Sequence, residues 1–118
     1  MVSKCYIICE ARSECLRMAA DKIRPVKDKH AVYMRARPKN VGDLLLSLAD
    51  DDPLIKESDD IYIIIPLIDP PQKKNVIAAL TKFTQKRINY FWYHAPDWFD
   101  REQTAISAVT EAKNIQNN

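Results

Sequence analysis

Three short apolar runs, each followed by a polar cluster, constrain the fold of this chain more than any other feature. They are "CYIIC", "IYIIIPLI" and "INYFWY", at residues 5–9, 61–68 and 88–93. Continuous apolar runs bounded by charged residues are typical of buried parallel strands. A less regular run at 31–36 predicts a further strand nearer an edge, and the run from Ile61 to Leu67 predicts a central strand.

Segments of helical periodicity separate these runs. The expected helices begin at Ser13, Asn40, Asp69 and Asp100, where a short polar side chain can accept hydrogen bonds from backbone N–H groups. Asp43 takes the place of the acid of a capping box after Asn40. Strand–helix–strand crossovers of this length force parallel pairing. The sequence therefore predicts a three-layer, Rossmann-like α/β fold, with a mostly parallel sheet of about four strands and four flanking helices.

Length and composition narrow the classes of protein. With 118 residues, the chain predicts one α/β domain over residues 1–113 and a polar tail at 114–118. Gly42 is the single glycine, whereas nucleotide-binding loops need several so that the backbone can approach phosphates. This excludes phosphate-loop NTPases and dinucleotide-binding enzymes, and we expect no cofactor. The net charge of +2 gives no basic excess typical of nucleic-acid binding.

Cysteine content and hydropathy predict a cytoplasmic, or at least intracellular, protein. Cys5, Cys9 and Cys15 form no CxxC pair, and Cys5 and Cys9 fall on one face of the first expected strand. We expect three reduced, mostly buried thiols and no disulfide. No signal peptide is recognisable in the sequence, and no stretch approaches the roughly 20 apolar residues that span a bilayer.

Glu10, Asp69 and His94 are the candidate chemical groups, because each follows one of the three apolar runs. Ligands of open α/β sheets bind at the carboxyl ends of the strands. If the first and third strands are neighbours, two carboxylates there could hold a divalent cation or act as acid and base. The structural alternative is favoured: Asp69 caps a helix, Glu10 pairs with Arg12 or Arg35, and His94 is packed or hydrogen-bonded. No metal site is therefore expected.

Two further groups of residues are expected to have structural roles. Asp50, Asp51 and Asp52 are consecutive, so their side chains point in different directions and predict a solvated helix end rather than a cation site. His30 is placed in a loop among lysines.

Aromatic residues crowd the segment "NYFWYHAPDWFD". They could stack on single-stranded nucleic acid, although residues of the expected strand would be covered by helices. Trp98 and Phe99 follow in an expected loop, beside Pro96, and are better candidates for exposure. Exposed aromatic side chains of this kind are typical of protein contacts. The alternative is that Trp98 is buried in its own domain.

The layout resembles the N-terminal domain of the DHH phosphoesterase family, which includes RecJ-type nucleases. The segment "YIICEARSECLRMAADKI" is similar to a first strand with its turn and helix, and "IYIIIPLIDPP" to a strand that ends in Asp before a helix. The segment "WYHAPDW" resembles the Asp-His-His-Pro motif, but Tyr93 stands in place of Asp and Ala95 in place of the second His. Ala11, Arg12, Ser13 and Glu14 stand where the family has aspartates.

These departures imply that most ligands of the family's two manganese ions are missing. Glu10, Arg12, Asp69 and His94 are then the positions of a degenerate site, and the resemblance implies a non-catalytic protein-interaction module. An inert relative in the family binds the GINS complex, so the implied partner is GINS or another replication or repair factor. Two alternatives remain: a small metal-dependent phosphoesterase or nuclease that uses Glu10, Asp69 and His94, and a ligand-sensing α/β module.

Overall fold

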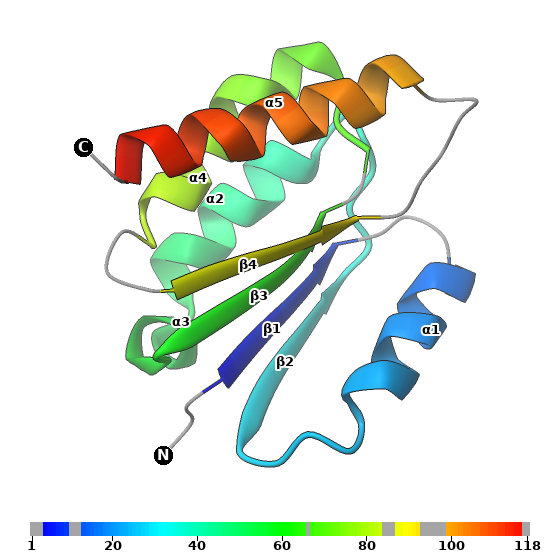
Figure 1. The fold of residues 1–118 in the computed structure, drawn as a ribbon, viewed down its shortest axis with the longest axis vertical. Helices are drawn as coiled ribbons and strands as arrows, with labels where there is room; N and C mark the ends of the chain where they lie inside the picture. The colour runs from blue at the N-terminus through cyan, green and yellow to red at the C-terminus, as the bar shows by residue number, and fades with distance from the viewer. Residues whose placement is uncertain (1–3, 10–12, 66, 84–86, 93–98, 117–118) are drawn as a thin grey trace.

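A four-stranded parallel sheet forms the centre of the molecule (Figure 1). The computed structural model describes residues 4–9, 13–65, 67–83, 87–92 and 99–116. The strand order is β2-β1-β3-β4, where β1 is Lys4–Cys9, β2 is Lys29–Met34, β3 is Asp60–Ile65 and β4 is Arg87–Trp92. All three pairings are parallel. The predicted α/β fold is confirmed, with β2 at an edge and β3 in the interior of the sheet.

Helices cover the two faces of the sheet unequally (Figure 1). Of the helices that the structure describes, α1 lies alone on one face, whereas α2, α4 and α5 lie together on the other. The helices are α1 (Ser13–Ile23), α2 (Val41–Asp51), α3 (Pro53–Glu57), α4 (Lys73–Thr81) and α5 (Phe99–Gln116), with a 3₁₀ turn, η1, at Pro70–Gln72. The described residues thus hold five α-helices, one more than predicted, because the short α3 follows α2 directly.

Strand β1 contributes to a core on each side of the sheet. Cys5, Ile7 and Cys9 are fully buried in the larger core, which contains residues of α2, α4 and α5. Ile8 points the other way and packs with Ala19 and Ile23 of α1 in a smaller core. This alternation follows from the two-residue period of a strand. It also confirms that Cys5 and Cys9 share a face; both are buried and neither is in a disulfide.

The amino end of α2 is capped by a residue distant in the sequence. Asn40 occupies the N-cap position but makes no side-chain cap there, because its Oδ1 accepts a hydrogen bond from the Arg37 N–H at 2.7 Å. Instead, Gln72 Oε1 accepts from the N–H groups of Gly42 and Asp43, at 2.8 and 3.2 Å. The predicted cap by Asn40 is therefore wrong, since a side chain of η1 satisfies these donors.

The bounds of α5 also differ from the prediction. The helix begins at Phe99, which was expected in a loop, and it continues to Gln116. Residues 114–116, assigned above to a polar tail, are therefore helical. Gln116 Nε2 donates a hydrogen bond to the Leu80 carbonyl at 2.9 Å, which ties the end of α5 to α4.

The contact of α2 with η1 and α4 explains the single glycine. A Cβ atom on Gly42 would lie 2.7 Å from Asn75 Cβ and 2.9 Å from the Gln72 carbonyl oxygen. We predict that Gly42→Ala lowers the free energy of unfolding by about 1 kcal/mol, because a steric cost of about 1–3 kcal/mol exceeds the gain in helix propensity of roughly 1 kcal/mol. Urea denaturation measures this change.

Ser47→Ala, on the exposed side of the same helix, is the matched control and should leave the midpoint nearly unchanged. A Gly42→Ala variant more stable than the wild type would contradict this account of the α2–α4 contact.

Candidate functional site

The chain reverses direction across the sheet between β1 and β3. From β1 the chain crosses to β2 on one side, and from β3 it crosses to β4 on the other. Such a switch point opens a crevice at the carboxyl ends of the two strands, where ligands of α/β proteins bind. The neighbouring positions of β1 and β3, required for Glu10 and Asp69 to approach each other, are confirmed. Glu10, Arg12, His94, Pro96 and Trp98 lie outside the described residues.

Asp69, the described member of the predicted site, is engaged with α5. Its carboxylate Oδ1 accepts a hydrogen bond from Arg101 Nε and forms an ion pair with that side chain. Its N–H donates to the Pro38 carbonyl at 3.0 Å, and the neighbouring Ile68 N–H donates to the Arg101 carbonyl at 3.3 Å. The side chain of Asp69 makes no cap at η1, so the predicted capping role is wrong. The carboxylate instead joins the end of β3 to the first turn of α5.

Phe99 is the described residue of the predicted protein-contact segment. Its side chain is 60% exposed, the largest value among the exposed large hydrophobic residues of the described chain. It opens α5, two residues before Arg101, and the contacts of Arg101 with Ile68 and Asp69 fix that end of the helix. An exposed aromatic ring on a fixed helix end is suited to contact another molecule.

The three consecutive aspartates have separate partners. Asp50 forms an ion pair with Lys82, and Asp51 accepts a hydrogen bond from Ser47 Oγ at 3.3 Å. Asp52 caps α3, since its Oδ1 accepts from the N–H groups of Leu54 and Ile55. Among the residues that the structure describes, no group of three or more His, Cys, Asp and Glu side chains could hold a metal ion.

The prediction that His30 lies in a loop is wrong. His30 lies in β2, where it faces Asp52. Its Nε2 lies 3.0 Å from Asp52 Oδ2, and both side chains are largely buried. Burial alone would raise the pKa of Asp52. Hydrogen bonds from His30, Leu54 and Ile55, together with the charge of His30, outweigh burial and lower that pKa below 3.8. The pair links the edge strand to the helix that precedes β3.

Cys5 lies close to this pair but is not activated by it. Burial, and secondarily the negative charge of Asp52, raises the pKa of the Cys5 thiol to about 12, although a hydrogen bond with Ser58 acts in the opposite direction. The thiol is therefore protonated at physiological pH, and a thiolate is the form that acts as a nucleophile or a metal ligand. Cys5, His30 and Asp52 stabilise the fold and do not form a nucleophilic site.

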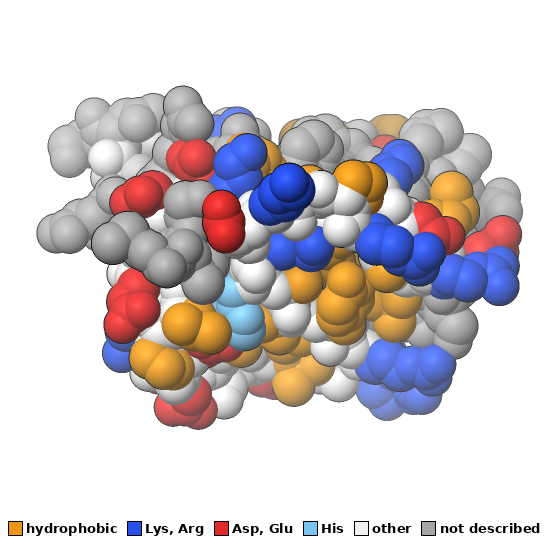
Figure 2. Space-filling model, turned by 90° about the horizontal axis from the view of Figure 1, so that it is seen from below, with side chains coloured by type: hydrophobic (Ala, Val, Ile, Leu, Met, Phe, Trp, Pro, Cys, Tyr) orange, Lys and Arg blue, Asp and Glu red, His pale blue; other side chains and the backbone are white. Residues whose placement is uncertain are grey.

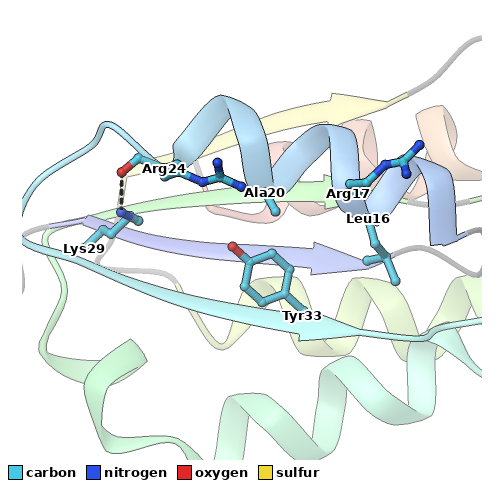
Figure 3. A pocket seen from close by; sticks show the side chains of 6 residues that line it. All are labelled: Leu16, Arg17, Ala20, Arg24, Lys29 and Tyr33. Carbon is cyan, nitrogen blue, oxygen red and sulfur yellow. Dashed lines mark hydrogen bonds between the residues drawn. The ribbon is translucent and has the colours of Figure 1, made fainter.

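A groove between α1 and β2 is the feature that the sequence analysis missed (Figure 3). It is open to solvent, has a volume of about 560 Å³ and is lined by Leu16, Arg17, Ala20, Arg24, Lys29 and Tyr33. Tyr33 rises from β2 toward α1, and its side chain is 48% exposed. Lys29 Nζ donates to the carbonyls of Arg24 and Val26, at 3.2 and 2.7 Å, so it stays at the end of the groove.

The charged residues of the chain are strongly segregated. Residues 13–39 contain eight Lys and Arg against three Asp and Glu, whereas residues 40–60 contain one against seven. Figure 2 shows the consequence: hydrophobic side chains gather in the middle of this face, with many Lys and Arg side chains on one side and several Asp and Glu side chains on the other. The net charge of the whole chain is small and does not reveal this separation. A count of charged residues in each segment of the sequence would have found it.

Comparisons with known proteins give no relative. No family model matches the chain, and no curated protein and no solved structure resembles it significantly. Within the described residues, none of the helices has the length and apolar character needed to cross a membrane.

The His30–Asp52 pair predicts a specific acid dependence of stability. The folded-state pKa of Asp52 is lowered, so its stabilising contribution is present above pH 3.8 and is lost as the pH falls through the lowered pKa. Asp52→Asn keeps an oxygen that can cap α3 but removes the charge. We expect it to lower the free energy of unfolding at neutral pH by about 1 kcal/mol and to flatten the loss of stability in acid.

Urea denaturation across this pH range tests the prediction, with Asp51→Asn as the control for the same change at an exposed neighbour. If Asp52→Asn retained the acid dependence of the wild type, another carboxylate would be responsible.

Proposed function

We propose that this chain is a non-catalytic, DHH-like protein-interaction module that contacts its partner through the start of α5. The observation that carries the proposal is the ion pair between Asp69 and Arg101. This pair holds Asp69, the described acidic residue at the carboxyl edge of the sheet, in a structural contact. It also fixes the start of α5, where the side chain of Phe99 is exposed. A carboxylate held by an arginine is a poor ligand for a cation, because the cation must displace the guanidinium group.

DNA replication or repair is the process that the family resemblance suggests, with GINS or another replication factor as the partner. The contact surface proposed here is Phe99 together with Pro96 and Trp98 of the preceding segment. Large aromatic side chains supply most of the binding energy in many interfaces, which makes Phe99 the residue to test first.

Affinity capture from an extract of the native cell, followed by mass spectrometry, tests the contact surface. We expect Phe99→Ala to reduce recovery of the partner about fivefold or more, since loss of an interface anchor costs more than about 1 kcal/mol. Ile115→Ala is the matched control, because Ile115 is 52% exposed near the other end of the same helix. Equal recovery of all partners by the wild type and both variants would exclude Phe99 from the interface.

A manganese titration by calorimetry separates the proposal from the metal-dependent phosphoesterase. We expect no saturable binding by the wild type, and no cleavage of single-stranded DNA in the presence of manganese. Asp69→Ala is the informative variant for both measurements. Saturable manganese binding by the wild type that disappears in Asp69→Ala would overturn the non-catalytic assignment and favour the hydrolase that uses Glu10, Asp69 and His94.

A further inference from the structure

Strand β2 presents a free edge beside a positively charged groove. It is the outermost strand of the sheet, and among the described strands it pairs with β1 alone. Within the described residues, Lys29–Met34 makes no backbone–backbone hydrogen bond outside the sheet. No residue of β2 is buried, whereas four of the six residues of β1 are. The strand contains no proline or glycine that would prevent an additional strand from pairing with it.

The two faces of β2 differ in chemistry next to this edge. Lys29 and Tyr33 point toward α1, where Arg17 and Arg24 border the same groove (Figure 3). Met34 packs against the larger core on the opposite face, and Val32 lies on that face by alternation and is partly exposed. A strand paired with this edge would therefore have one face beside cationic groups and the other beside Val32, next to the His30–Asp52 pair.

The cations of the groove are suited to several negative charges. Arg17 and Arg24 are seven residues apart, which corresponds to about 10 Å along a helix axis. Arg24 forms an exposed ion pair with Asp21, at 2.7 Å, whereas Arg17 forms no ion pair among the described residues. Lys29 donates only to carbonyl groups in the described contacts, so no carboxylate neutralises it.

We infer that the β2 edge binds an extended peptide of a partner protein, in which acidic residues alternate with apolar ones. The peptide adds a fifth strand to the sheet through main-chain hydrogen bonds with β2. Its acidic side chains face Arg17, Arg24 and Lys29, and its apolar side chains face Val32. The free strand edge favours a peptide over a nucleic acid, because a nucleic acid cannot continue a ladder of backbone N–H and C=O groups.

This surface lies apart from the start of α5 and does not depend on the function proposed above. Phe99 belongs to α5, which lies on one face of the sheet. The groove is formed by β2 and by α1, which lies on the opposite face. Phe99→Ala therefore serves as a control here: it should leave binding at β2 unchanged whether or not it impairs partner capture.

Fluorescence anisotropy with a labelled, end-blocked peptide of alternating Glu and Val tests the inference. We expect binding that weakens with added salt, and no binding of the Lys–Val peptide of equal length. A Glu–Val peptide with methylated backbone nitrogens should also fail, because it cannot donate main-chain hydrogen bonds. On binding of the unmethylated peptide, amide hydrogen exchange should slow in β2 and not in β4.

Substitutions in the groove make the test specific to this surface. Arg17→Glu and Tyr33→Ala should each weaken binding of the Glu–Val peptide about tenfold, because they reverse a charge and remove an aromatic anchor. Lys74→Glu makes the same kind of charge reversal on an exposed residue of α4 and should have little effect. Thermal denaturation establishes that each variant is folded.

Three outcomes would overturn the inference. The first is binding of the Glu–Val peptide that neither groove variant weakens. The second is binding of an oligothymidine, but not of the Glu–Val peptide, with the same dependence on Arg17 and Tyr33; the groove would then be a nucleic-acid surface. The third is self-association of the chain that by itself protects the β2 amides, which would make a second copy the occupant of the edge.

Discussion

Strand β1 is paired in parallel with β2 on one side and β3 on the other, and the rest of the structure depends on this double pairing. Its side chains enter both cores: Cys5, Ile7 and Cys9 on the side of three helices, and Ile8 on the side of α1. Burial on both faces explains why the run is continuously apolar. The same pairing places the switch point between β1 and β3, and it leaves β2 and β4 as the edges of the sheet.

Contacts between segments distant in the sequence hold the helices on this sheet. Gln72 caps α2 across the contact that Gly42 makes possible, and Arg101 joins α5 to the end of β3 through Asp69 and Ile68. At the opposite end of the sheet, Asp52 caps α3 and also contacts His30 of β2 through its carboxylate. Each of these polar side chains pairs with backbone N–H groups or with a charged side chain. These pairings matter because polar groups in partly buried positions need hydrogen-bond partners.

The distribution of charge gives the molecule two different sides. A basic segment forms α1, the loop after it and β2, and an acidic segment forms α2 and α3. Between them, apolar side chains gather on the face shown in Figure 2. Strand β2 is the edge strand of the sheet. At the carboxyl edge of the sheet, by contrast, Asp69 is paired with Arg101, and Phe99 exposes an aromatic ring. We propose both as binding surfaces. In its described part, neither contains a set of groups for acid–base or nucleophilic catalysis.

The sequence by itself determined the fold class, because runs such as Ile61–Ile65 and the helical segments between them can bury their apolar side chains only in a sheet covered by helices. It also indicated the edge position of β2 and the shared face of Cys5 and Cys9. Only the tertiary structure decided the partners of polar side chains. Asp69 pairs with Arg101, Gln72 replaces Asn40 as the cap of α2, and His30 meets Asp52 across 22 positions. Local rules of capping consider neighbours in the chain, whereas hydrogen bonds form between whichever groups the fold brings together, and the groove between α1 and β2 exists for the same reason.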